Sequence, residues 1–401
     1  RQFSTSAELS PDYTPTYWYW ADTMIMASFI QEFPYVEEKY VLDSLKIWNS
    51  AFAKKPLDDS YSWVYITRAY ISEQLARLPG TSRWTQCWEA IIYLERGMLL
   101  GQQDTFWIHL SRIHRALNNM ANALSNTQVA LQIEPENTVC MEERAAILAN
   151  IGDFEEAAQV TEAHLRQEEN DFAKAIKAYI LLHTGHPDEA LVILNDILDK
   201  EPDYIWAREL QAYCYRRLGD TPKADDASRL IWEYYCSIAA KHQEAYMDSH
   251  KDGAAWAAYQ LNKIDDALPL FESLRDDLTM DPGNMDSNIG LCYLAKGDLT
   301  RGEENLRIGI EQMINIPQFD DISIDLEELR KRASNWSHID HAQLDSVLSR
   351  LAEKIQQQKR KVNHTQSPKK ELRAIIKQYP RKSEVGHYAW IGANAGLARI
   401  Y

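Results

Sequence analysis

One stretch of this sequence, residues 171–224, reads DFAKAIKAYILLHTGHPDEALVILNDILDKEPDYIWARELQAYCYRRLGDTPKA. Within it Ala178 and Ala190 lie twelve positions apart, and Ala212 and Ala224 repeat that spacing 34 residues later. Small side chains at these places let two helices approach closely. A period near 34 residues with paired helices is typical of helical-repeat proteins, whose units stack to bury a shared core. The stretch therefore predicts an all-α solenoid.

Four further pairs of small residues with the same spacing lie on either side of this stretch. They are Ser111 with Ala123, Ala145 with Ala157, Ala255 with Ala267, and Gly290 with Gly302. Counted between second members, the spacings are 34, 33, 34, 43 and 35 residues. Seven positions after each first member stands a residue type that accepts the left-handed backbone at a helix end: Asn118, Gly152, Gly185, Gly219, Asn262 or Gly297. Six pairs in phase with six turn residues predict six helical hairpins.

These hairpins divide the chain into three parts. The repeats occupy residues 104–313, with units expected near 104–137, 138–170, 171–204, 205–247, 248–282 and 283–316. Residues 1–103 are expected to form longer helical pairs, and their first helix, residues 14–33, is apolar nearly all round. Such a helix has to be buried by neighbours, so it either caps the repeats or docks on a partner. Residues 317–401 are expected to form a basic helical segment.

Two segments depart from the regular period. The spacing of 43 residues places an insertion within 232–252, in a lengthened second helix that carries four rings: Trp232, Tyr234, Tyr235 and Tyr246. These rings either form a local ligand wall or fill a bend in the solenoid. After the repeats we expect a linker at 317–321, a short helix over 324–334, and a long helix from the cap Asp340 to about residue 361. The final run, residues 388–401, either begins another unit or lies in the groove as a lid.

Several residues of these hairpins match a known repeat pattern, W-x2-L-G-x2-Y, then A-x3-F, then P. The best matches are Trp107, Leu110, Ser111, Ala123 and Pro135 in one unit, Ala267 with Phe271 in another, and Ile289, Gly290, Tyr293, Gly302 and Leu306 in a third. On these residues the segment from 104 to 313 resembles the tetratricopeptide repeat (TPR) family. His114, Thr127 and Thr161 depart from its pattern. The resemblance implies a right-handed superhelix with a concave groove, and a peptide- or protein-binding role.

The TPR resemblance also implies which residues face the groove, because the first helix of each unit lines it in that family. The positions implied are Phe172, Ile176 and Tyr179 in one unit and Trp206, Leu210 and Tyr213 in the next, with Arg112, Arg115, Arg216 and Arg217 on neighbouring phases. The rings either pack between repeats or anchor an extended or helical peptide whose charged groups meet the arginines.

One binding mode of the family is excluded on its residues. Repeats that grip chaperone C-terminal carboxylates use Lys and Asn, then Asn, then Lys and Arg at set groove positions. Here those positions hold Ile108 and Arg112, then Glu143, then Phe172 and Ile176. We therefore do not expect this chain to bind the chaperone tail.

Charge is distributed unevenly along the chain. Residues 354–401 contain eleven Lys and Arg against two Glu, a charge of +9, which leaves −25 on residues 1–353 out of a total of −16. The acidic body should attract basic partners and repel nucleic acid. The basic segment either docks on this body or on a partner, or is a solvated helix, or binds nucleic acid or lipid headgroups. No recognisable nucleic-acid recognition module accompanies these charges, which does not favour nucleic acid.

Signatures of catalysis are missing from the sequence. It contains no GxGxxG, GxxxxGK[ST], HExxH or GxSxG motif. The two His-x2-His pairs, at 183–186 and 338–341, have no Cys or carboxylate set at ligand spacing. We therefore predict a non-enzyme without cofactor or metal. The five scattered cysteines predict buried, reduced thiols and an intracellular, cytoplasmic location, with an organelle as the alternative. No apolar run is long enough to predict a transmembrane helix.

The sequence thus favours a non-catalytic adaptor or scaffold that binds a peptide or protein segment in the groove of a TPR-like solenoid. One alternative is the regulatory sensor region of a signalling protein, with the basic C-terminal segment as an internal lock. A second alternative is an RNA-binding helical repeat, which would require salt-sensitive binding through the basic segment. Removing that segment distinguishes the first two, because only a locked sensor would then bind its partner more tightly.

Overall fold

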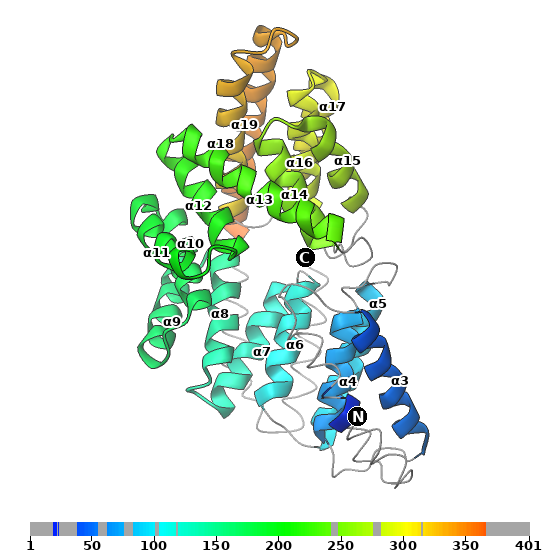
Figure 1. Cartoon of the computed structure of the whole chain (residues 1–401). Coiled ribbons are helices and arrows are strands. Elements are labelled where there is room, and N and C mark those ends of the chain that lie inside the picture. The colour runs from blue at the N-terminus through cyan, green and yellow to red at the C-terminus, as the bar shows by residue number, and fades with distance from the viewer. Residues whose placement is uncertain are drawn as a thin grey trace. The chain divides into compact units, whose positions relative to one another are not determined.

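The computed structural model describes residues 19–21, 23, 38–54, 62–75, 83–100, 104–117, 119–241, 248–275, 282–313 and 316–365. These residues form helices joined by short turns, and no strand occurs among them (Figure 1). The helices are α3 (Glu38–Lys54), α4 (Ser62–Leu75), α5 (Arg83–Leu100), α6 (Asp104–Ala116), α7 (Met120–Ile133), α8 (Thr138–Asn150), α9 (Phe154–Gln167), α10 (Asp171–His183), α11 (Pro187–Lys200), α12 (Ile205–Leu218), α13 (Thr221–Lys241), α14 (Asp248–Gln260), α15 (Ile264–Leu274), α16 (Pro282–Ala295), α17 (Leu299–Gln312), α18 (Ile316–Ala333) and α19 (His341–Thr365). The fold is all-α, as predicted.

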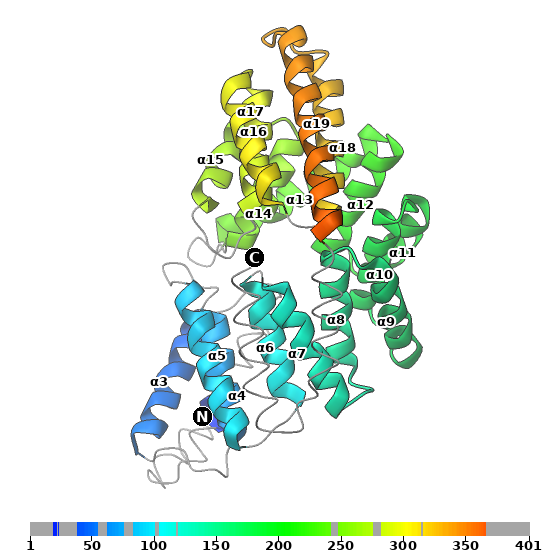
Figure 2. The same cartoon turned by 180° about the vertical axis from the view of Figure 1, so that it is seen from behind.

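The chain divides into two compact units. One unit consists of residues 1–149 and 153–281 and contains α3 to α15, apart from the turn at 150–152. The other consists of residues 150–152 and 282–401 and contains α16 to α19. Within each unit successive helices form antiparallel hairpins, for example α16 with α17, which lie side by side in both views (Figures 1 and 2). We call the even-numbered helices from α4 to α18 the first helices of these pairs, and the odd-numbered helices that follow them the second helices.

The pairs of small residues lie where the two helices of a hairpin meet. Every alanine of the five pairs that contain one is at most 2% exposed. In the α6–α7 hairpin the hydroxyl of Ser111 donates a hydrogen bond to the carbonyl oxygen of Ala123 over 2.9 Å. In the α16–α17 hairpin a Cβ added to Gly290 would come within 2.9 Å of the carbonyl oxygen of Gly302. Larger side chains at these places would force the two helices apart, which explains why small residues recur at these positions of the sequence.

The turns between the helices of each hairpin adopt the predicted left-handed backbone. The φ angles are 79° at Gly152, 91° at Gly185, 75° at Gly219, 57° at Asn262 and 84° at Gly297. In this conformation the Cβ atom comes too close to a backbone carbonyl oxygen, so glycine, which has no Cβ, tolerates it best, and asparagine tolerates it better than most other residues. Asn118, the sixth turn residue, lies outside the described residues. Five of the six turn predictions are therefore confirmed.

The predicted linker at 317–321 is wrong, because these residues belong to α18. Pro317 is the second residue of the helix, a position at which a backbone N–H has no partner within the helix, so the N–H that proline lacks is not needed there. Phe319 and Ile322 are at most 3% exposed, so this first turn also contributes to the core. The cap at Asp340 is confirmed, since its Oδ1 accepts a hydrogen bond from the backbone N–H of Gln343 over 3.0 Å at the start of α19.

Other predictions meet the structure only in part. The second helix of the long unit, α13, has 21 residues where α11 has 14, in line with the insertion. Its Tyr235 is buried in a core cluster with Ile231 and Ile238, which agrees with rings that fill a bend. Most of residues 14–33, all of 388–401, and Tyr246 lie outside the described residues. None of the five cysteines, all of which are described, forms a disulfide, and four are buried as predicted, whereas Cys236 is exposed.

Candidate functional site

Two of the predicted groove residues, Phe172 and Trp206, form a ring pair on neighbouring first helices. Each is the second residue of its helix, α10 or α12. Asn170 fixes the start of α10 by accepting a hydrogen bond from the N–H of Ala173 over 2.7 Å. The ring centroids of Phe172 and Trp206 are 5.3 Å apart with an interplanar angle of 40°. Trp206 packs on the core beneath it, whereas Phe172 remains 37% exposed, so the pair offers an apolar surface to solvent.

A second ring pair continues onto the next first helix. Tyr213 of α12 stacks on Trp256 of α14 with centroids 6.1 Å apart, and Trp256 in turn stacks on the buried Tyr259. Trp256 was not among the predicted site residues. The signal was present, because Trp256 follows the small residue Ala255 just as Tyr179 follows Ala178 and Tyr213 follows Ala212. Rings therefore occupy the same repeat position on α10, α12 and α14.

The remaining predicted groove residues lie at different depths. Tyr179 is partly buried and contacts His183, with ring centroids 4.3 Å apart. Ile176 and Leu210 are only 1% and 5% exposed, so they belong to the core and support the rings from beneath. The structure thus brings four of the six positions (Phe172, Tyr179, Trp206 and Tyr213) to or near the surface of the first helices.

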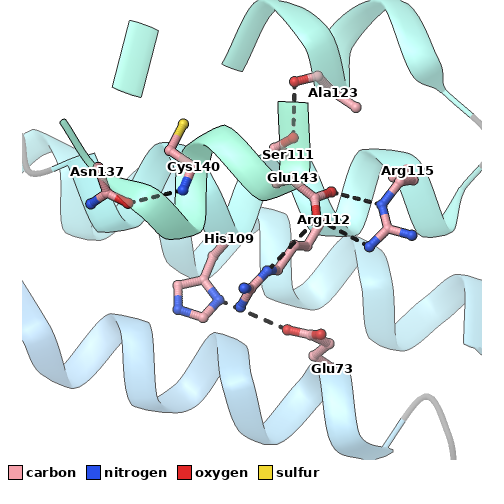
Figure 3. A network of polar contacts seen from close by, with 9 residues as sticks. All are labelled: Glu73, His109, Ser111, Arg112, Arg115, Ala123, Asn137, Cys140 and Glu143. Carbon is pink, nitrogen blue, oxygen red and sulfur yellow. Dashed lines mark hydrogen bonds and ion pairs between the residues drawn. The ribbon is translucent and has the colours of Figure 1, made fainter. Parts of the chain in front are cut away.

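A polar network joins the first helices α4, α6 and α8 (Figure 3). Glu143 of α8 is 5% exposed and accepts two hydrogen bonds from Arg115 of α6, over 2.7 Å and 3.1 Å. Arg112, one turn earlier on α6, points at the same carboxylate with its Nε 3.9 Å from Oε2. His109 lies 3.9 Å from Glu73 of α4. The fork of Arg115 matches a carboxylate in two places, so Glu143 holds Arg115 firmly and leaves Arg112 more loosely engaged.

A partly buried carboxylate lies beside the second ring pair. Glu209 of α12 lines a small pocket together with Tyr213, Arg216 and Trp256. It accepts a hydrogen bond from the hydroxyl of Tyr235 over 3.0 Å. Burial raises the pKa of Glu209 to about 7, against the lowering effect of this hydrogen bond and with a further rise from the charge of Asp252. Burial also raises the pKa of Asp252 itself, to about 6.

The predicted site residue Arg216 contacts both a ring and a second helix. Its guanidinium carbon lies 4.7 Å from the centroid of the Tyr213 ring, a cation–π arrangement. Its Nη1 donates a hydrogen bond to Ser228 of α13 over 3.4 Å. Arg216 therefore belongs to the α12–α13 packing as well as to the aromatic surface.

The described part of the basic segment is helical and pairs with carboxylates of its own unit. Lys354 of α19 lies 2.5 Å from Glu311 of α17, and Lys359 pairs with Asp320 of α18. One turn earlier, Arg350 makes two hydrogen bonds of 2.6 Å to Glu303. These contacts lower the pKa of Glu303 and of Glu311 through their hydrogen bonds to Arg350 and Lys354. Residues 366–401, which carry most of the remaining positive charge, lie outside the described residues.

Two properties of the described residues bear on other kinds of site. No three His, Cys, Asp or Glu side chains of the described part converge as metal ligands would. Among the helices that are described, none is both long enough and apolar enough to cross a membrane.

Comparison with known proteins shows similarity at the level of the fold. No family model matches the sequence, and no curated protein matches it significantly. A Rap protein solved in complex with Competence and Sporulation Factor is similar over 86% of this chain and 99% of its own, with a TM-score of 0.53 and 15% identity. YrrB, a TPR protein with an unusual peptide-binding site, covers 52% of this chain and 96% of its own, with a TM-score of 0.36 and 17% identity.

A tetratricopeptide repeat protein from Parabacteroides merdae covers 73% of this chain and 98% of its own, with a TM-score of 0.37 and 14% identity. At these identities the comparisons speak to architecture. The similarity to the Rap protein, together with the hairpins, the small-residue pairs and the left-handed turns, gives this chain a TPR-like helical-repeat fold.

Proposed function

We propose that this chain is a non-catalytic protein-binding repeat, an adaptor or scaffold that holds a segment of a partner protein against α10, α12 and α14. The observation that carries the proposal is the pair of ring contacts that links these three first helices, Phe172 with Trp206 and Tyr213 with Trp256. The TPR resemblance implies that first helices line a groove. A partner segment lying across these helices would meet one ring or one ring pair in each helical hairpin.

The physical state of these rings supports a binding role. Large aromatic side chains that are packed on one side and open on the other supply contact area at low cost in conformational entropy, and they are the residues enriched at binding hot spots. Trp206 packs on the α10–α11–α12 core while Phe172 leaves more than a third of its surface open. Phe172 thus offers open aromatic surface beside a ring that the core holds in place.

Arginines on the first helices supply the second part of a binding surface. Arg112 is one-third exposed and holds its place beside the firmly bound Arg115 and Glu143. An arginine with free donors next to a fixed ion pair can accept a carboxylate from a partner and thereby set the register of the bound segment. In this proposal the rings provide affinity and Arg112 and Arg216 provide orientation.

The proposal is tested by panning a library of random linear peptides on the immobilised full chain. The affinity of each enriched peptide is then measured by calorimetry with wild type, Trp206→Ala and Val192→Ala. Val192 is a matched control because it is 70% exposed on the second helix α11, away from the rings. We expect Trp206→Ala to weaken binding about tenfold or more, as truncation of an aromatic hot spot does, and Val192→Ala to leave the affinity unchanged.

Thermal melting of each variant reports whether the fold survives. If Trp206→Ala lowers the melting temperature strongly, Phe172→Ala replaces it, because Phe172 is the more exposed ring of the pair. Failure to enrich any peptide, or equal affinities for the ring variants and wild type, would overturn the proposed function.

A further inference from the structure

The Phe172–Trp206 pair lies in an acidic neighbourhood. The segments that lead into α10 and α12 read EEND at 168–171 and DKEPD at 199–203. Glu168, Glu201 and Asp203 are exposed. Burial raises the pKa of the nearby phenol of Tyr204 to about 12, and the charges of Glu201, Asp171 and Glu142 contribute to this rise. The two rings therefore sit where the local potential favours a cation.

The cations of this neighbourhood are already held by other groups. Lys174 pairs with Glu169 and Asp196, and Lys200 shares Asp196 at 2.7 Å. Arg208 donates to the carbonyl oxygen of Pro202 over 2.8 Å. Because these groups point at oxygen atoms, they leave the faces of the two rings without a positive charge.

Other aromatic side chains of the protein carry a cation of their own. Arg216 lies over Tyr213, Lys263 over Trp232, and Arg301 over Tyr293, with distances to the ring centroids of 4.7, 4.9 and 4.3 Å. Within the described part of the chain, no Lys or Arg lies over the ring of Phe172 or of Trp206. This pair thus combines open ring surface, negative surroundings and a missing cation.

We propose that the Phe172–Trp206 pair is a subsite for the side chain of an arginine or lysine in a partner segment, an inference that rests on the proposed protein-binding function. A planar guanidinium stacks on the tilted rings, and the exposed carboxylates of Glu201 and Asp203 attract it without having to bond it directly. The class of partner that fits is a basic segment with an arginine or lysine at the position that reaches α10 and α12.

The test uses the full chain labelled with 5-fluorotryptophan and the small probe N-acetyl-arginine amide. The fluorine signal of Trp206 is assigned by its absence in Trp206→Phe. N-acetyl-citrulline amide is the matched control probe, because it keeps the shape of arginine and has no charge. We expect the Trp206 signal to shift with arginine amide and to need about two- to fivefold more citrulline amide for the same shift, the usual size of an exposed cation–π contact.

A ring variant then locates the effect. Phe172→Leu keeps an apolar side chain against Trp206 and removes one of the two rings, so it should reduce the preference for arginine over citrulline. Val192→Ala should keep that preference in full. Equal shifts with both probes in the wild type, or an undiminished preference in Phe172→Leu, would overturn the inference.

Failure of this inference is distinguishable from failure of the proposed function. Suppose panned peptides bind, lose affinity on Trp206→Ala, but tolerate replacement of every arginine and lysine by citrulline. The protein-binding function then stands and the cation subsite is wrong. If instead no peptide binds while arginine amide still shifts the Trp206 signal selectively, the cation subsite stands on its own and the proposed function is wrong.

Discussion

Glu209 shows how one side chain links packing to pH at the edge of the aromatic surface. It lies between α12, α13 and α14, where Tyr235 donates a hydrogen bond to it and Asp252 adds a second acidic group. Burial disfavours the charged carboxylate, so its pKa rises from 4.5 to about 7. A carboxyl that is neutral in the folded protein at mildly acidic pH costs less to bury than a charged one.

The raised pKa makes the folded protein less stable as the pH increases. Because the folded pKa lies above the unfolded pKa, the stabilising protonation is fully present below pH 4.5 and is lost as the pH rises to about 7. The loss for this one group is at most about 3 kcal/mol. Glu209→Gln keeps an acceptor for Tyr235 and cannot ionise, so we expect the melting temperature of this variant to fall less between pH 5 and pH 8.

The control for this prediction is Glu233→Gln, which changes an exposed glutamate on the same α12–α13 hairpin. Its melting temperature should follow that of wild type at every pH. Asp252, whose pKa is also raised, should account for the pH dependence that remains in Glu209→Gln, so adding Asp252→Asn should flatten the curve further. Parallel curves for wild type and Glu209→Gln would contradict the prediction.

At the scale of the helical element, hairpin geometry depends on the absence of side chains at the contact. In the α16–α17 hairpin a Cβ on Gly290 would meet the backbone N of Leu306 at 2.8 Å and the carbonyl oxygen of Gly302 at 2.9 Å. Backbone atoms cannot move aside as a flexible side chain can, so the helices themselves have to separate. Overpacking of this kind typically costs about 1–3 kcal/mol.

We therefore expect Gly290→Ala to lower the melting temperature and to speed amide hydrogen exchange in α16 and α17. The intrinsic helix propensity of alanine stabilises the variant by about 1 kcal/mol. A net loss of stability would therefore show that the steric contact of the added Cβ with α17 outweighs this gain. Gly185→Asn is the comparison, because nothing lies within 4 Å of an added Cβ there, so this variant reports the strain of a side chain at a φ of 91° without any steric contact. A Gly290→Ala variant as stable as wild type would show that the hairpin tolerates a wider spacing.

The same hairpins show why the fold could be predicted from the sequence. Small pairs such as Ala178 and Ala190 and left-handed turns such as Gly185 are requirements of local geometry, and a local requirement repeats visibly along the chain. The start of α18 was not predicted, because Pro317 is compatible both with a linker and with a first helical turn. Only the burial of Phe319 distinguishes the two.

The candidate site could be predicted in part for a related reason. Repeat position predicted Phe172 and Trp206, whose rings contact each other in the structure, and the same position could also have indicated Trp256, which stacks on Tyr213. Repeat position indicates which face of the helix a side chain is on, but it does not indicate how deeply that side chain is buried. Ile176 and Leu210 share the predicted face and are buried. The contact of Glu209 with Tyr235 joins residues 26 positions apart on different helices. Such a contact depends on tertiary packing and leaves no periodic signal.

At the scale of the whole molecule, the role of the basic C-terminal segment distinguishes two functions. In a scaffold this segment leaves the binding surface open, whereas in a locked sensor it docks on the acidic body and covers that surface. The first cations of that segment, Lys354 and Lys359, are part of α19 and pair with Glu311 and Asp320. Exposed pairs of this kind contribute little to stability each, yet they show that α19 serves as the second helix of a hairpin. A truncation at residue 353 would cut this helix, so the boundary for removing the basic segment belongs after Thr365.

A chain that ends at Thr365 therefore separates the two functions without removing α19. If the protein is a scaffold with an accessible surface on α10, α12 and α14, peptides selected on the full chain should bind the shortened chain with the same dissociation constant within about twofold. If residues 366–401 were an internal lock, their removal would release the surface, and the affinity would rise by the reciprocal of the fraction of time for which the lock had been open. Calorimetry at two salt concentrations measures both cases, because a lock built on a segment this basic would also open as salt screens its charges. We expect the scaffold outcome, and a tighter, salt-independent affinity in the shortened chain would establish the sensor instead.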